Sequence, residues 1–258
     1  MEKSGRYSKN YRGLNMSTIT LSVITSGAFA AALKLLAPMY EKKSGRTVQL
    51  SFGSSMGAAP DSIPTRLAKG EVFDVLVLAG PALDQFINSG VIASGSKVDL
   101  AGSKMAAAVR TGDKVPDLST VASFKENLLN TSRIAYSASA SGTYLSEEIF
   151  PKLGIADQMA ISAKKIYGER VGTILMRNEA DLGFQQYSEL LPIAGIDIIR
   201  NFPPEIEKTF YFTAGIGANT TQIDQAREFI AYLASEEAAP TIRETGLDAV
   251  LAHLPWAN

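Results

Sequence analysis

Residues 19–52 read ITLSVITSGAFAAALKLLAPMYEKKSGRTVQLSF and alternate strand-like and helix-like patterns. Residues 19–25 form a short apolar run that predicts a strand, and residues 28–44 carry apolar side chains at helical spacing before Gly45. Val48–Phe52 predicts a second strand. A strand, a helix and a strand at this spacing require two parallel strands joined by a crossover helix.

The same alternation continues to the end of the chain. Further strands are predicted at residues 74–78, 103–110, 133–137, 165–167, 182–186 and 209–216. Helices are predicted in a short segment ending at Gly70 and at residues 81–89, 123–130, 143–153, 171–177, 224–235 and 237–244. This pattern predicts the α/β class, with mainly parallel sheets flanked by helices.

Composition excludes several functions. The chain has 258 residues, 46% of them apolar and 20% charged, as expected of a globular protein with one large core or two modest ones. The net charge is −1 and no long basic run occurs, so no nucleic-acid partner is expected. There is no cysteine, and His253 is the only histidine, so disulfides, thiolate catalysis, zinc sites and Ser–His catalysis are excluded. No phosphate loop or dinucleotide motif is present.

Three loops rich in serine and glycine follow predicted strands: TSGA at residues 25–28, GSSMG at 53–57 and SASASGT at 137–143. Ligands of open α/β sheets bind beyond the carboxyl ends of the strands. Unpaired N–H groups at a helix start, with hydroxyls beside them, suit an anion. The loops therefore predict an anion site that includes Ser26, Gly27, Ser54, Ser55, Ser139, Ser141, Gly142 and Thr143.

Two further segments are predicted to contribute to this site. Arg170 follows the strand that ends at Tyr167, where its guanidinium can bind a carboxylate through two parallel hydrogen bonds. Gln186 ends the strand at residues 182–186, and its amide can orient an oxygen-rich ligand.

Several segments together resemble the molybdate-type periplasmic solute-binding proteins. They are, in chain order, VITSGAFAAALKLLAPMYEKKSG, SFGSSMG, GEVFDVLVLA, NEADLGFQQYSEL and AREFIAYLASEEAAPTIRETGL. The resemblance implies a two-lobed flytrap, the type 2 periplasmic-binding-protein fold, in which two strands cross between the lobes. It implies a first lobe of residues 16–102 plus 205–258 and a second lobe of residues 103–204.

The resemblance also bears on the ligand. The serine of the family's second loop falls on Ser55, and its helix start in the second lobe falls on Ser141 and Gly142. The first-loop serine position reads Ala28, with Ser26 two residues earlier, and the tyrosine position reads Gln186, with Tyr187 beside it. These departures favour a di- or tricarboxylate over a molybdate-like oxyanion.

The leading hypothesis is a solute-binding-type protein that holds a small anion between its lobes, with an ABC transporter as partner if it is exported. The alternative is the aconitate isomerase branch of the same family, which implies an allylic proton shift between trans- and cis-aconitate without metal or organic cofactor. For that reaction Glu169, Tyr144 and Tyr187 are candidate proton carriers, and the sequence does not choose between them. A third hypothesis is an intracellular ligand sensor.

The N-terminal segment bears on location. Residues 1–15 are polar and basic and are expected to be a disordered extension. The apolar stretch that follows is interrupted by Ser26–Gly27 and contains Lys34, which favours strand, loop and helix over a signal peptide. The expectation is a cytoplasmic protein without membrane insertion, or a periplasmic one if a signal has been trimmed.

Overall fold

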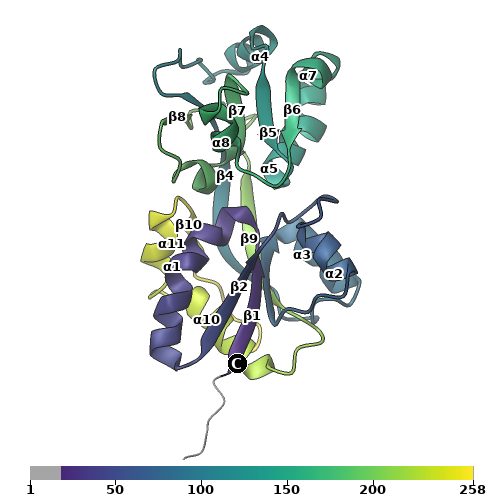
Figure 1. Cartoon of the computed structure of the whole chain (residues 1–258), viewed down its shortest axis with the longest axis vertical. Helices are drawn as coiled ribbons and strands as arrows, with labels where there is room; N and C mark the ends of the chain where they lie inside the picture. Colours follow the sequence, from purple (N-terminus) through teal and green to yellow (C-terminus); the bar gives the residue numbers. More distant parts are fainter. Residues whose placement is uncertain (1–18, 258) are drawn as a thin grey trace, which may run out of the picture.

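The computed structural model describes residues 19–257 and has the expected alternation of strands and helices (Figure 1). The predicted disordered extension, residues 1–15, lies outside the described residues. The strands are β1 Thr20–Thr25, β2 Thr47–Phe52, β3 Val75–Ala79, β4 Val98–Arg110, β5 Ile134–Ser137, β6 Ala163–Ile166, β7 Leu182–Gln186, β8 Ile196–Ile199, β9 Thr209–Ile216 and β10 Asp248–Ala249.

The helices alternate with these strands. They are α1 Gly27–Ser44, α2 Ile63–Ala68, α3 Gly80–Asn88, α4 Val121–Asn130, α5 Ala140–Tyr144, α6 Phe150–Lys152, α7 Ala156–Ser162, α8 Val171–Met176, α9 Tyr187–Leu190, α10 Ile223–Leu233 and α11 Ala239–Glu244. A π-helical turn, Leu145–Ile149, joins α5 to α6. The Phe150 N–H bonds to the carbonyl of Leu145, five residues earlier, which is the π-helical pattern. The next residue, Pro151, has no N–H to donate.

The sheet explains the two-lobed shape. Its strand order is β2-β1-β3-β9-β4-β7-β5-β6. β1 is parallel to β2 and β3 in the first lobe, and β5 is parallel to β6 and β7 in the second. The long strands β4 and β9 pair antiparallel and run between the lobes, as Figure 1 shows. The fold class is therefore confirmed: two α/β lobes joined by two crossover strands.

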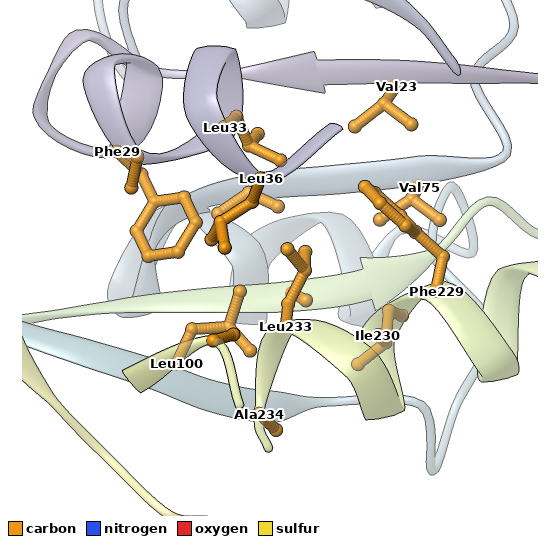
Figure 2. Packing of buried hydrophobic residues seen from close by; sticks show 14 of the residues in the cluster. Val23, Phe29, Leu33, Leu36, Val75, Leu100, Phe229, Ile230, Leu233 and Ala234 are labelled. Carbon is orange, nitrogen blue, oxygen red and sulfur yellow. The ribbon is translucent and has the colours of Figure 1, made fainter. Parts of the chain in front are cut away.

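Each lobe has its own core. In the first lobe, α1 and α10 pack on the sheet through Phe29, Leu33, Leu36 and Phe229, all fully buried (Figure 2). The α1 residues are those that helical spacing placed on one face, so the predicted amphipathic pattern is confirmed. In the second lobe a separate cluster surrounds Phe124 and includes residues of β4, β5 and β7.

The predicted lobe boundary between residues 102 and 103 falls inside β4, which begins five residues before the predicted strand start. Its first residues pair with β9, and its last residues pair with β7 and β8. The second predicted boundary, between residues 204 and 205, precedes β9. These lobe boundaries remain a prediction.

The short elements α7, α9, β8 and β10 were not predicted. A segment of two to seven residues is too short for a clear hydrophobic period. One of these elements, α9, carries Glu189, which lines the cavity between the lobes. Within residues 19–257, no helix is both long and apolar enough to cross a bilayer.

Candidate functional site

A cavity of about 340 Å³ lies between the lobes, at the carboxyl ends of the parallel strands. The loops after β1 and β2 line it from the first lobe, and the loops after β5 and β6 line it from the second. Six of the residues predicted for the anion site are among its lining: Ser26, Gly27, Ser54, Ser55, Ser139 and Arg170. The position agrees with the rule that ligands bind beyond the strand ends.

Four other predicted residues are not part of the cavity lining. Ser141 and Gly142 are buried in the first turn of α5, and Thr143 follows them on the same turn. A Cβ atom on Gly142 would lie 1.6 Å from the Ser137 carbonyl oxygen, so this glycine allows α5 to approach the end of β5 closely. Gln186 is buried, and neither end of its amide has a hydrogen-bond partner in the described residues.

Hydroxyl groups face the cavity from both lobes. Ser26, the residue before α1, is buried, and its Oγ has no hydrogen-bond partner in the described residues. Ser55 Oγ accepts a hydrogen bond of 3.0 Å from the Ala79 N–H, which fixes that side chain. Across the cavity, Ser137 Oγ and Ser139 Oγ are 2.8 Å apart. The unpartnered hydroxyl of Ser26 is therefore available to a ligand.

Two cationic side chains line the cavity, one from each lobe. Arg170 is the residue before α8, and Lys34 lies on α1. Neither side chain forms an ion pair or a hydrogen bond with any residue between 19 and 257. Free cations in a cavity attract anionic ligands, and an arginine can hold a carboxylate through two parallel hydrogen bonds.

A carboxyl group lies among these donors. Glu189, on α9, lines the cavity and is only 7% exposed. Its Oε1 accepts a hydrogen bond of 3.0 Å from Nε2 of Gln185, which lies on β7 four residues earlier. The same oxygen lies against Gly27, where a Cβ atom would be 2.1 Å away. Because Gln185 Oε1 also accepts a 2.7 Å bond from the Val171 N–H, the amide that holds Glu189 is itself fixed.

Burial sets the protonation of this group. It raises the pKa of Glu189 from 4.5 to about 7, although the Arg170 charge and the Gln185 hydrogen bond oppose the rise. A carboxyl group with a pKa near neutrality exchanges a proton readily in both directions. Buried titratable groups of this kind in a cleft are candidates for acid–base chemistry.

The raised pKa predicts a pH-dependent stability. The folded state holds the Glu189 proton more tightly than the unfolded state, so this contribution to stability is fully present below about pH 4.5 and is lost as the pH rises through about 7. For complete ionisation the loss is about 3 kcal/mol. Urea unfolding of the wild type and of Glu189→Gln at about pH 5 and about pH 8 measures it. The variant should gain stability relative to the wild type at the higher pH, and a difference independent of pH would contradict the buried, ionisable Glu189.

The three proton carriers suggested by the sequence lie elsewhere or are otherwise engaged. Glu169 lines the cavity, but both of its oxygens accept hydrogen bonds from Arg177, at 2.8 and 2.9 Å, which lower its pKa. Tyr144 donates to the Ile206 carbonyl in the core of the second lobe, and burial raises its pKa. Tyr187 is stacked under the Arg200 guanidinium, 4.0 Å away, outside the cavity lining.

Sequence reasoning missed Glu189 and Lys34 as residues of the cavity lining. Gln185 and Glu189 are four residues apart, as on one face of a helix, but Gln185 belongs to strand β7 and Glu189 to a four-residue helix. Lys34 occupies one face of α1 together with Gly27 and Ala30, and all three line the cavity. Among residues 19–257 there is no group of three or more His, Cys, Asp and Glu side chains that could hold a metal ion.

Comparison with known proteins places this geometry in a family. Residues 21–248 match the family described as bacterial extracellular solute-binding protein. The chain belongs to this family. An aconitate isomerase from a Pseudomonas species is 40% identical to this solute-binding protein over 233 residues, which are 90% of this chain and 89% of that protein. A putative ABC transporter substrate-binding lipoprotein of Bacillus subtilis is 26% identical over 242 residues, 90% of this chain and 87% of its own length.

Solved structures agree with the fold of this solute-binding protein. The periplasmic molybdate-binding protein of Azotobacter vinelandii superposes with a TM-score of 0.69 at 22% identity, covering 88% of this chain and 98% of that one. The sulfate-binding protein SubI of Mycobacterium tuberculosis superposes with a TM-score of 0.71 at 13% identity, covering 89% and 86%. At such identities the structural similarity shows the fold alone. The predicted membership of the solute-binding proteins is confirmed by the sequence match to the family.

Proposed function

We propose that this solute-binding protein holds a tricarboxylate between its lobes and interconverts trans- and cis-aconitate by an allylic proton shift. The observation that carries the proposal is the buried Glu189 carboxyl, with a pKa of about 7, in a cavity that otherwise offers anion donors. An ionised carboxyl group repels an anionic ligand, whereas a carboxyl group that takes up and releases a proton serves an allylic proton shift. The 40% identical relative named aconitate isomerase supports the same reaction.

The donors around the cavity fit the substrate's charges. Arg170 takes one carboxylate through its guanidinium, and the free hydroxyl of Ser26 with the N–H groups at the start of α1 receives another. Ser139, beside the start of α5, provides a further hydroxyl from the second lobe. Contacts from both lobes favour a closed state around the ligand.

Glu189 supplies the proton chemistry. In its ionised form it takes a proton from the substrate's methylene carbon, so a C–H bond breaks and an O–H bond forms on the carboxyl group. The electron pair of that C–H bond forms a new double bond to the central carbon, and the pair of the old double bond moves to the former vinylic carbon. The negative charge spreads onto the conjugated carboxylates, where Arg170 and the hydroxyl donors stabilise it. The protonated Glu189 carboxyl group then gives its proton to the former vinylic carbon and returns to its ionised form. The double bond has moved by one position, and no oxidant or reductant is consumed.

Proton NMR of purified protein with trans-aconitate tests the function. We expect the vinyl and methylene signals of cis-aconitate to appear, and the same equilibrium mixture to form from cis-aconitate. A protein that is stabilised by aconitate against heat but converts neither isomer would be a solute-binding protein without turnover. Stronger stabilisation by molybdate than by tricarboxylates would contradict the carboxylate ligand.

Solute binding for transport is the second candidate function, and the family match favours it. The relative named as a substrate-binding lipoprotein of an ABC transporter supports such a transporter as partner. The family's extracellular description supports the periplasmic alternative for location over the cytoplasmic expectation. The NMR experiment separates the two functions because only the isomerase changes its ligand.

Arg170 provides a direct test of the ligand's class. Arg170→Met removes the guanidinium and keeps an apolar stem of similar length, so binding of a tricarboxylate should weaken about 10- to 100-fold. Isothermal titration with tricarballylate, a saturated tricarboxylate that cannot undergo the allylic shift, measures the affinity. Arg243→Met, on α11 and outside the cavity lining, is the matched control. Equal affinities of the two variants would remove Arg170 from the site.

A further inference from the structure

Lys34 lines the cavity from α1 and has no role in the proton shift described above. Gly27, Ala30 and Lys34 follow one another at intervals of three and four residues, so they share one face of α1, and all three line the cavity. Helical side chains lean toward the helix N-terminus. The Lys34 ammonium is therefore directed back toward the Ser26–Gly27 start of α1.

The Lys34 ammonium is oriented by an aromatic ring. Its Nζ lies 4.9 Å from the centroid of the Phe52 ring, and Phe52 also lines the cavity. The face of an aromatic ring attracts a cation without neutralising its charge. Lys43, on the same helix, forms an ion pair with Glu237, whereas Lys34 has no carboxylate partner among residues 19–257. Lys34 thus presents an oriented charge that has no ion-pair partner within residues 19–257.

The cavity lining contains other charged groups besides the Lys34 ammonium. Glu169 is engaged by Arg177, and Glu189 has its pKa raised by burial. Asp61 is an exposed carboxylate of the lining, and it forms no ion pair with the described residues. The cavity therefore has two cations without an ion-pair partner in the described residues, Lys34 on the first lobe and Arg170 on the second. The Arg170 guanidinium alone can bind a ligand with a single carboxylate, through two parallel hydrogen bonds. Each additional carboxylate of a ligand needs another donor.

We propose that Lys34, which lies over Phe52 and has no ion-pair partner in the described residues, is a specificity-determining residue that selects ligands carrying more than one carboxylate. The proposal rests on the proposed function for the carboxylate class of the ligand and adds the residue that discriminates within it. Lys34 contributes little to binding a monocarboxylate, and its contribution appears once a second carboxylate reaches the first lobe. Discrimination by charge number also explains why an exposed cation is left unpaired in the lining.

Affinities across a charge series test this role. We would titrate the wild type, Lys34→Met and Lys34→Arg with butyrate, succinate and tricarballylate, which carry one, two and three carboxylates. Lys34→Met should weaken tricarballylate binding about 10-fold and leave butyrate binding close to that of the wild type, and Lys34→Arg should restore most of the loss. Lys42→Met, on the same helix but outside the cavity lining, controls for removal of a surface charge.

The outcomes separate this proposal from the proposed function. Equal tricarballylate affinity in Lys34→Met and Lys42→Met, or equal losses for all three ligands, would overturn the specificity role. Absence of tricarballylate binding by the wild type would overturn it as well. If Lys34→Met shows the expected pattern while the wild type converts no aconitate, the specificity role stands and the isomerase function is contradicted.

Discussion

Glu189→Gln is expected to slow aconitate interconversion about 10²- to 10⁴-fold, the usual contribution of a positioned general acid–base group. The amide has nearly the same shape as the carboxyl group but cannot accept the substrate's proton. It keeps an oxygen for the 3.0 Å hydrogen bond from Gln185, so the cavity keeps its form. Initial rates by proton NMR give the loss, and titration with tricarballylate should show that ligand binding survives.

The control for this variant is Glu179→Gln. Glu179 is an exposed glutamate that pairs with Arg177 outside the cavity lining, so its loss should leave the rate near that of the wild type. A Glu189→Gln protein that retains its rate would contradict the assignment. A large loss in Glu169→Gln instead would return the role to the proton carrier that the sequence suggested.

Gly27→Ala should lower kcat about 10²-fold, because a displacement of about 1 Å in a reacting group costs that much. A Cβ atom at this position would lie 2.1 Å from Glu189 Oε1 and 3.0 Å from its carboxyl carbon, so the carboxyl group must move. Gly27 does not have a positive φ, so the effect comes from this contact and not from backbone strain. Steady-state kinetics should show a fall in kcat larger than the change in KM.

Two comparisons make the Gly27 prediction specific. Gly80→Ala, at the start of α3, adds a Cβ atom that meets its nearest neighbours at 3.7 Å, so it should leave kcat unchanged. In a Glu189→Ala background the Gly27→Ala clash disappears, and the second substitution should cost no further stability. Full activity in Gly27→Ala would contradict the close packing of Glu189 against α1.

The fold could be predicted because its determinants are local. The helical spacing of apolar residues in α1 and the strand patterns of β1 and β2 on either side of it identify a β-α-β unit, whose connectivity fixes parallel pairing. The crossover strand β4 was predicted, but its predicted start at residue 103 lies five residues after its observed start at Val98. Its first residues belong to the other lobe's sheet, and that difference does not appear in the sequence pattern.

The site was predicted where chemistry follows from the loop itself. The serine-rich loops after β1, β2 and β5 line the cavity because parallel strands end at one edge. Ser141 and Gly142 were given a binding role, yet the chain buries them where α5 meets β5. Glu189 escaped prediction because its burial depends on residues distant in sequence: Gly27 of the first lobe lies against its carboxyl group, and the Val171 N–H fixes the neighbouring Gln185 amide. Burial of this kind is a tertiary property.

The proposed function requires the cavity to move a proton along the substrate's allylic system. Trans-aconitate labelled with carbon-13 at its methylene carbon tests it most directly, because the shift turns that carbon into the vinylic carbon of the product. We predict that carbon NMR finds the label at the vinylic position of cis-aconitate formed by the wild type, and that Glu189→Gln forms almost none. Cis-aconitate with the label still at its methylene carbon, or no conversion at all, would contradict the allylic proton shift.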